Sequence, residues 1–254
     1  MVKPYYQDEW VTIYHGDCRE ILPHLTNIDM VFTSPPYNMG NTTGGGCTYT
    51  GNGARFRLGY DSSSDNLPED EYAAFQKQVL LQCWKTLTES GAIYYNHKPR
   101  VLNYEVQLPI VFNPGLPLRQ VVIWNRRGGS SFGEGHYVGN CEWILIFAKK
   151  EFRLLSKSAS ATGDIWDIPE EREGLGHPAP FPIALPSKAI LTTNAAIILD
   201  PFAGSGSTLL AAKKLNRQSI GIEISERYCE IAARRCSQSV FDFTKAVKVS
   251  GGRE

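Results

Sequence analysis

The chain has no excess of charge of either sign. Its 254 residues include 26 lysines and arginines and 26 aspartates and glutamates, so its formal net charge at pH 7 is zero. A protein that attracts a polyanion through its overall field needs a positive excess, and this composition excludes that mode of binding. Any binding of nucleic acid must therefore use local groups of basic side chains.

The sequence also lacks paired cysteines and long apolar runs. Its six cysteines, at positions 18, 47, 83, 141, 229 and 236, include no CxxC pair, so we predict neither a metal site nor a disulfide framework. Scattered cysteines in a chain of this size fit a reducing cytosol. The first ten residues contain no apolar signal core, and no run reaches membrane-spanning length. We expect a soluble, cytoplasmic protein that contacts no membrane.

Short runs of β-forming residues alternate with helical stretches, which predicts an α/β fold with a mostly parallel sheet covered by helices. Seven strands are expected, at residues 11–14, 30–33, 92–96, 120–124, 143–148, 197–200 and 219–223. The clearest helices are expected at 69–88, 207–215 and 226–236. The chain is long enough for a large core and shows no internal repeat, so we expect residues 1–254 to form a single domain.

Two polar segments interrupt this pattern. Residues 40–64 are rich in Gly, Ser, Thr and Asn, and residues 128–136 are rich in glycine between two expected strands. Long loops in compact domains commonly carry function. We expect the first to be a lid and the second to be the tip of a hairpin.

One short segment, Thr33-Ser34-Pro35-Pro36-Tyr37-Asn38, follows an apolar strand and has the character of an active-site loop. Two adjacent prolines donate no backbone hydrogen bonds and fix φ, so the strand opens into a stiff turn rich in carbonyl groups. The hydroxyl and carbonyls could accept hydrogen bonds from an amino group on a flat molecule while Tyr37 covers its face. A rigid loop whose tyrosine plugs a crevice is the alternative.

A second segment, Asp200-Pro201-Phe202-Ala203-Gly204-Ser205-Gly206, joins an expected buried strand to a helix. Glycines let a ligand approach the backbone, and the first amides of the helix are available to an anionic group, with Ser207 or Thr208 as a candidate cap. Glu223, at the end of the next strand, could accept hydrogen bonds from ribose hydroxyls. A dinucleotide site is one candidate, although the segment lacks the third glycine of the dinucleotide-binding fingerprint. A P-loop is less favoured, because no Gly-Lys-Ser/Thr follows.

A chain that carries both segments in this order closely resembles the S-adenosylmethionine-dependent DNA methyltransferases that modify exocyclic amino groups, in their circularly permuted β class. The resemblance covers most of residues 11–236 and extends to Gly16-Asp17-Cys18 and to residues 163–169 and 177–182. It implies a Rossmann-like sheet of seven strands with helices on both faces. It also implies S-adenosylmethionine as the cofactor.

The resemblance implies roles for individual residues. Residues matching the glycine segment enclose the methionine part of the cofactor, Glu223 matches the acidic residue that holds its ribose, and Asp17 matches one that contacts its adenine. The implied cofactor-binding set is Asp17, Thr33, His177, Phe181, Asp200, Pro201, Phe202, Ala203, Gly204, Ser205, Gly206 and Glu223. Asp17 could instead be a turn residue, and prolines alone could explain the segment that begins at His177.

The expected catalytic residues are Ser34, Pro35, Pro36 and Tyr37. The amino nitrogen of a base is a poor nucleophile, so positioning carries much of the rate. Acceptors on Ser34 and Pro35 could bind the amino hydrogens and stabilise the developing charge while Tyr37 stacks on the base, which must first be flipped out of the duplex. Because serine is a weak base, we expect in-line methyl transfer with the proton leaving late, to solvent.

Ser34 also bears on the target base. Many members of the resembling family carry aspartate at this position, and serine is commoner among the N4-cytosine enzymes. We therefore expect methylation of cytosine N4 in DNA, with adenine N6 as the alternative. A methyltransferase of RNA or of a protein amide, and an inactive nucleic-acid-binding module, are more distant alternatives.

Basic residues near the expected loops are candidate phosphate contacts: Arg55, Arg57, His97, Lys98, Arg100, Arg126 and Arg127. Ordinary solvated charge explains any one of them singly. We expect double-stranded DNA as the partner, with loops 40–64 and 125–141 as recognition elements. The apolar stripe of helix 69–88 fits either a homodimer interface or a core helix. No nuclease signature is evident, which favours an orphan enzyme or the modification enzyme of a restriction-modification system with a separate endonuclease.

Overall fold

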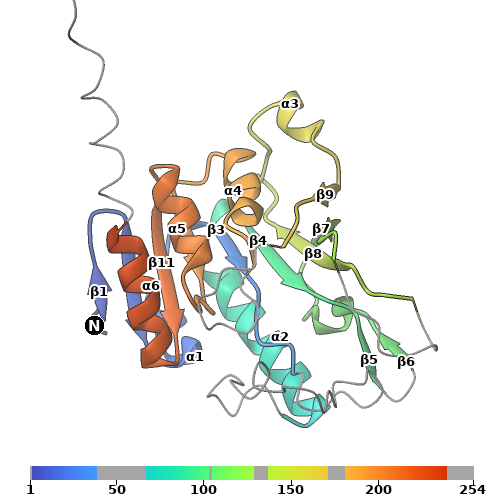
Figure 1. Cartoon of the computed structure of the whole chain (residues 1–254), viewed down its shortest axis with the longest axis horizontal. Helices are drawn as coiled ribbons and strands as arrows, with labels where there is room; N and C mark the ends of the chain where they lie inside the picture. Colours follow the sequence, from blue (N-terminus) through green and yellow to red (C-terminus); the bar gives the residue numbers. More distant parts are fainter. Residues whose placement is uncertain (1, 39–66, 103–104, 129–136, 171–180, 239–254) are drawn as a thin grey trace, which may run out of the picture.

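A nine-stranded sheet forms the centre of the molecule (Figure 1). The computed structural model describes residues 2–38, 67–102, 105–128, 137–170 and 181–238. In spatial order the strands are β1 (Tyr6–Gln7), β2 (Val11–His15), β11 (Gln218–Glu223), β10 (Ile197–Asp200), β3 (Ile28–Thr33), β4 (Leu87–His97), β8 (Cys141–Ala148), β7 (Leu118–Asn125) and β9 (Ile165–Asp167). A separate hairpin pairs β5 (Arg100–Leu102) with β6 (Glu105–Gln107).

The sheet is mostly parallel, as expected. Strands β2, β11, β10, β3 and β4 are joined by parallel pairs, whereas β8 runs antiparallel to both β4 and β7. All seven expected strands are present, but the expected number was wrong, because β1 and β9 join the two edges. These edge strands have two and three residues, too few to show an alternating pattern in the sequence.

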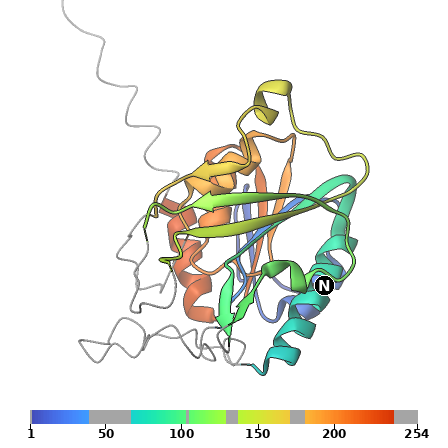
Figure 2. The same cartoon turned by 90° about the vertical axis from the view of Figure 1, so that its right-hand side faces the viewer.

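Helices cover both faces of the sheet, as Figure 2 shows. On one face lie α1 (Cys18–Ile21), α2 (Glu69–Thr86) and the 3-10 turns Leu22–His24 and Pro109–Phe112. On the other face lie α4 (Ala184–Leu191), α5 (Ser207–Lys214) and α6 (Glu226–Gln238). A short helix, α3 (Lys157–Ser160), lies outside these layers. The predicted α/β class with helices on both faces is confirmed.

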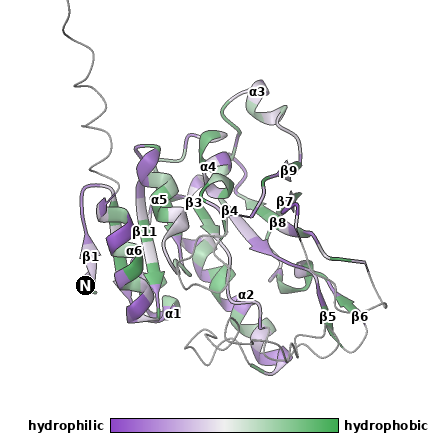
Figure 3. Ribbon diagram, viewed as in Figure 1, coloured by the Kyte–Doolittle hydropathy of each residue, from purple (hydrophilic) through white to green (hydrophobic). Residues whose placement is uncertain are grey.

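Central strands are apolar on both sides because both faces are covered. In β4, Ile93 and Tyr95 join the core beneath α2, whereas Ala92 and Tyr94 join the core beneath α4 and α5. This alternation follows from the two-residue period of a strand. In Figure 3 the helices, α6 among them, carry green apolar and purple polar residues in turn. Because helices cover both faces, a ligand-binding site is expected at the edge of the sheet where the parallel strands end.

The apolar stripe of α2 belongs to the core. Val79, Leu80 and Cys83 are buried, and Phe75 and Trp84 pack against the same cluster. Core packing thus accounts for the stripe without a second subunit. Within the described residues, no helix is long and apolar enough to cross a membrane.

Candidate active site at the ends of the parallel strands

The segment at residues 33–38, called the proline loop below, lies beside the segment at residues 200–206, called the glycine turn. Strands β3 and β10 pair in parallel, with Leu199 opposite Val31, so both strands end at the same edge of the sheet. There the Thr33 hydroxyl donates a buried 2.8 Å hydrogen bond to Asp200 Oδ1, across 167 residues of sequence. The two segments singled out in the sequence therefore form one continuous site.

Asp200 links these segments from inside the protein. It is fully buried, and its carboxylate also accepts hydrogen bonds from Thr208 Oγ1 at 2.6 Å and from the Phe202 amide at 3.1 Å. Burial raises the pKa of Asp200 to about 6, against the opposing effect of these hydrogen bonds. Because Thr208 points inward to Asp200, the expected side-chain cap of α5 was wrong; its N-cap is Gly206, without a side-chain hydrogen bond.

The glycine turn uses backbone conformations that favour glycine. Gly204 has φ of 50° and Gly206 has φ of 84°. A Cβ on Gly206 would lie 2.9 Å from Ala232 Cβ, so the turn also lets α5 approach α6 closely. Between them, Ser205 is buried and accepts hydrogen bonds from Arg235 at its carbonyl and hydroxyl oxygens.

Replacing Gly206 with alanine is expected to lower the free energy of unfolding by about 2 kcal/mol, through backbone strain and overlap with Ala232. Gly115→Ala is the matched control, because Gly115 also has positive φ, of 94°, but its Cβ would meet nothing within 4 Å. Urea unfolding of both variants separates the two causes. Equal losses would show that the contact with Ala232 costs nothing.

Glu223 lies at the next strand end, beside the glycine turn. Its Oε2 accepts the Gly204 amide at 2.8 Å and its Oε1 accepts the Ser225 amide at 2.9 Å. Burial raises the pKa of Glu223. Each carboxylate oxygen has a second acceptor position, so the pair can receive two hydroxyl groups of a vicinal diol. These acceptor positions fit the two hydroxyl groups of a ribose.

Asp17 is close to Glu223 but already engaged. The Gly16 amide donates to the Glu223 carbonyl oxygen at 2.9 Å, which brings the two turns together. The Asp17 carboxylate caps α1 through the Arg19 amide at 2.8 Å and forms an ion pair with the Arg19 side chain. The arrangement matches the turn role considered for Asp17 and leaves its contact with a cofactor as a prediction.

The other residues of the implied cofactor set are placed as follows. Pro201 and Ala203 are buried, whereas Phe202 is half-buried with its ring 5.9 Å from that of Phe75. Phe181 packs its ring 5.7 Å from Phe32, beneath the proline loop strand. His177 lies outside the described residues.

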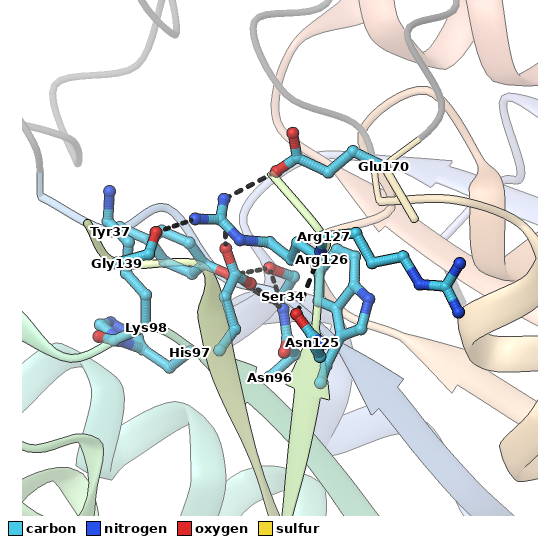
Figure 4. A network of polar contacts seen from close by, with 12 residues as sticks. Ser34, Tyr37, Asn96, His97, Lys98, Asn125, Arg126, Arg127, Gly139 and Glu170 are labelled. Carbon is cyan, nitrogen blue, oxygen red and sulfur yellow. Dashed lines mark hydrogen bonds and ion pairs between the residues drawn. The ribbon is translucent and has the colours of Figure 1, made fainter. Parts of the chain in front are cut away.

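The hydroxyl groups of the proline loop meet a carboxylate from another strand (Figure 4). Ser34 Oγ lies 2.6 Å from the Tyr37 hydroxyl oxygen, and the Tyr37 hydroxyl donates to Glu142 Oε2 at 2.9 Å. Asn96 Nδ2 donates to the same Glu142 oxygen at 2.7 Å and to the Tyr37 oxygen at 2.9 Å. Ser34 and Tyr37 are half-buried, whereas Pro35 and Pro36 are buried.

A second set of contacts fixes the backbone of the loop. Arg100 Nη1 donates to the Tyr37 carbonyl at 3.1 Å, and the Tyr72 hydroxyl lies 2.7 Å from the Pro36 carbonyl oxygen. Asn38, at φ of 54°, donates from its side chain to Glu69, which in turn pairs with Arg100 at 2.6 Å. These residues from outside the loop hold its backbone, so its conformation does not depend on the prolines alone.

The candidate phosphate contacts differ in burial. His97 and Arg100 are buried, so in this conformation they cannot meet a phosphate, and burial lowers the pKa of His97 to about 3. Arg126 lies 2.7 Å from Glu170 and 3.4 Å from Glu142, and it also donates to the Gly139 carbonyl, as Figure 4 shows. Arg127 is more exposed and pairs with Asp167.

Lys98 places its ammonium group 5.7 Å from the centre of the Tyr37 ring, at the edge of the proline loop. It is half-buried. Arg55 and Arg57, in the expected lid, lie outside the described residues. Loop 125–141 is described only at its two ends.

Sequence reasoning missed Asn96 and Glu142. Each lies at one end of an apolar run, Asn96 after residues 92–95 and Glu142 before residues 143–148, and 5% of Glu142 and none of Asn96 is exposed. A carboxylate placed directly before Trp143-Ile144-Leu145 is a signal in itself, because charged side chains are rarely buried without a partner.

Comparison with known proteins agrees with this geometry. The model of the N6/N4 DNA methylase family matches residues 28–234, which include both the proline loop and the glycine turn. The chain belongs to this family. The family predicted from the two segments is therefore confirmed, and with it the class of S-adenosylmethionine-dependent DNA amino-methyltransferases.

Individual relatives span most of the chain. The DNA adenine methyltransferase YhdJ of Escherichia coli is 25% identical, over 90% of this chain and 83% of its own length. Among solved structures, the cytosine-N4-specific PvuII DNA methyltransferase has a TM-score of 0.71 at 20% identity, covering 92% of this chain and 88% of its own. TTHA0409 of Thermus thermophilus, in complex with S-adenosyl-L-methionine, has a TM-score of 0.65 at 21% identity, covering 91% and 95%.

Proposed function

We propose that this protein transfers a methyl group from S-adenosylmethionine to cytosine N4 in double-stranded DNA, at a specific site, after flipping the target base. The observation that carries this proposal is the Thr33–Asp200 hydrogen bond, which joins an acceptor loop for an amino group to a turn suited to the cofactor. The whole chain would act as one methyltransferase domain. Loops 40–64 and 125–141 would contact the DNA.

The cofactor would lie along the turn from Phe202 to Gly206, with its ribose on Glu223. When bound, S-adenosylmethionine supplies an electrophilic methyl group. The chain's own contribution is to orient the amino nitrogen, through acceptors on Ser34 and Pro35, and to stabilise positive charge that develops on it. Asp200 would act from inside, because its buried hydrogen bonds hold the two segments in register.

Ser34 supports cytosine as the target, since a neutral hydroxyl replaces the aspartate of many adenine-modifying members. Adenine N6 is the alternative, and the likeness to YhdJ, a DNA adenine methyltransferase, favours it. The likeness to the PvuII enzyme concerns the fold at this level of identity. The two bases therefore need a direct test.

For DNA binding, we infer that Lys98 and Arg127 are the phosphate contacts among the described residues. Tyr137 is 99% exposed at the end of loop 125–141 and presents an aromatic ring to a partner. Arg126 would need to leave Glu142 and Glu170 to reach a phosphate. Further predictions are a homodimer, from the resemblance, action in the cytoplasm, from the scattered cysteines, and a separate restriction endonuclease, since no nuclease signature is evident.

The test is transfer of labelled methyl from S-adenosylmethionine to DNA, RNA and protein, followed by mass spectrometry of nucleosides from the treated DNA. We expect label in double-stranded DNA and N4-methylcytosine in the digest. Ser34→Ala should lower the single-turnover rate roughly tenfold, because one acceptor for the amino hydrogens is lost. N6-methyladenine without N4-methylcytosine would overturn the choice of base, and label confined to RNA or protein would overturn the choice of DNA.

A further inference from the structure

A carboxylate from β8 sits at the end of a hydrogen-bond chain that starts at Ser34. Glu142 lies near the start of β8, which runs antiparallel to β4, so it reaches the edge where the parallel strands end. The chain runs from Ser34 Oγ to the Tyr37 hydroxyl, over 2.6 Å, and from there to Glu142 Oε2, over 2.9 Å.

Donors and acceptors fix the direction of this chain. An ionised carboxylate can only accept, so the single hydroxyl hydrogen of Tyr37 goes to Glu142. Asn96 Nδ2 donates to both Glu142 and the Tyr37 oxygen, and exchanging its amide oxygen and nitrogen would set an acceptor against the carboxylate. With its hydrogen committed, the Tyr37 oxygen accepts from Ser34. Asn96 Nδ2 also lies 3.4 Å from Ser34 Oγ, a long contact that engages at most one of its lone pairs. Ser34 therefore donates inward and keeps an oxygen lone pair for an incoming amino group.

Arg126 steadies the other carboxylate oxygen. Its Nη1 lies 3.4 Å from Glu142 Oε1 and 2.7 Å from Glu170 Oε1. The Glu142 side chain is 7% exposed, so this charge is held largely away from water. Arg126 would retain the charge of Glu170 as a partner if Glu142 became neutral.

We propose that Glu142 is the residue that makes Ser34 an acceptor and that takes up the proton released by the methylated amino group. This inference rests on the proposed function. It places, two hydrogen bonds away from Ser34, the negative charge that many family members carry at position 34. The proton would then leave through the protein. This route differs from the sequence-based expectation, in which the proton leaves directly to solvent.

The proton transfer balances. After the methyl group has been transferred, the amino nitrogen carries a positive charge, and one of its N–H bonds breaks as an O–H bond forms at Ser34. The original Ser34 hydrogen moves to the Tyr37 oxygen, and the original Tyr37 hydrogen moves to Glu142 Oε2. The result is a neutral methylamino group and a protonated Glu142, with Ser34 and Tyr37 unchanged and no oxidation or reduction.

Glu142→Gln tests this role, because glutamine can still accept from Tyr37 but cannot take up a proton. We expect its single-turnover methylation rate to fall about 100-fold. Binding of S-adenosylmethionine and of DNA, measured separately, should stay within about twofold, since Glu142 contacts neither in this scheme. An unchanged rate would overturn the proposal, whereas an inactive wild-type protein would instead overturn the proposed function.

Glu170→Gln is the matched control. It removes the second carboxylate partner of Arg126 but touches no member of the Ser34 chain, so its rate should stay close to that of the wild type. An equal loss in both variants would mean that Glu142 acts only through Arg126.

Because Glu142 acts through the Tyr37 hydroxyl, the double variant Tyr37→Phe/Glu142→Gln should be no slower than Tyr37→Phe alone. Losses that multiply would contradict the chain.

A readout without catalysis follows the same bond. In protein labelled with ¹³C at tyrosine Cζ, the Tyr37 resonance, assigned by its loss in Tyr37→Phe, should shift in Glu142→Gln and not in Glu170→Gln. A resonance that responds to neither change would show that the Tyr37 hydroxyl does not donate to Glu142 in solution, and would overturn the proposal.

Discussion

Replacing Glu69 with alanine is expected to lower the free energy of unfolding by about 2 to 3 kcal/mol, because it leaves the buried guanidinium of Arg100 without a carboxylate, although the Glu69 side chain itself is 33% exposed. The Arg100 side chain is 1% exposed and pairs with Glu69 at 2.6 Å. Glu69 also accepts from Asn38 at 2.8 Å, next to the proline loop. The loss should therefore include looser packing of that loop, seen as a slower methylation rate at temperatures where the variant is still folded.

Glu71→Ala is the control for this change. Glu71 lies in the same first turn of α2 and is exposed, so its removal costs only the helix-dipole contribution, about 0.3 to 1 kcal/mol. Urea unfolding of the two variants gives the comparison. Similar losses would mean that Arg100 is satisfied by its remaining contacts with the Tyr37 carbonyl and Gln107.

A second large effect is expected from pH, where Asp200 and His97 act in opposite directions. Burial raises the pKa of Asp200 from 3.8 to about 6, so between these values the native protein binds more protons than the unfolded chain, and rising pH lowers stability. Burial lowers the pKa of His97 from 6.5 to about 3, so there the unfolded chain binds more protons, and falling pH lowers stability. The two contributions oppose each other between roughly pH 4 and 6.

Asp200→Asn removes the first contribution and exposes the second. Asparagine can still accept from Thr33 and from the Phe202 amide at its oxygen, and it can donate to Thr208, so two contacts keep their direction and the third is reversed. The free energy of unfolding of the variant, minus that of the wild type, should rise by about 2 kcal/mol from pH 4 to pH 7. Urea titrations at intervals of half a pH unit measure this difference, and a difference that stays constant would show that Asp200 titrates alike in both states.

Most of the fold could be predicted from the sequence because the central strands obey simple rules. Runs such as Ile197-Ile198-Leu199, which precede the site residue Asp200, are apolar throughout since both faces are covered, and the expected bounds of this strand, 197–200, are those of β10. Strand β9 could not be predicted, because Ile165 and Asp167 are exposed and its place is set by pairing with Ile123 and Asn125 of β7. Tertiary pairing, and not local preference, makes it a strand.

The candidate site was predictable to a similar degree. The two segments are local in sequence, and parallel pairing of β3 and β10 was enough to bring them together. Partners from other strands left no such pattern. Glu142 and Asn96 are single polar residues at the ends of apolar runs, and only the register of β8 against β4 brings them to Tyr37. Likewise, Thr208 could serve as a cap or as a donor to Asp200, and the choice depends on a side chain eight residues earlier.

The order of strands in the sheet also governs when this site can exist during synthesis. Strand β2 is made early, yet its neighbours are the two-residue β1 and β11, which is made some 200 residues later. The acceptor loop after β3 likewise waits for β10 to supply Asp200. At roughly 5 to 20 residues per second, a ribosome would need many seconds to release the missing strands. A nascent chain would thus hold β2 with only the two-residue β1 as a partner and be unable to methylate until the last parallel strand had emerged, so we expect chaperones to bind that early segment during translation.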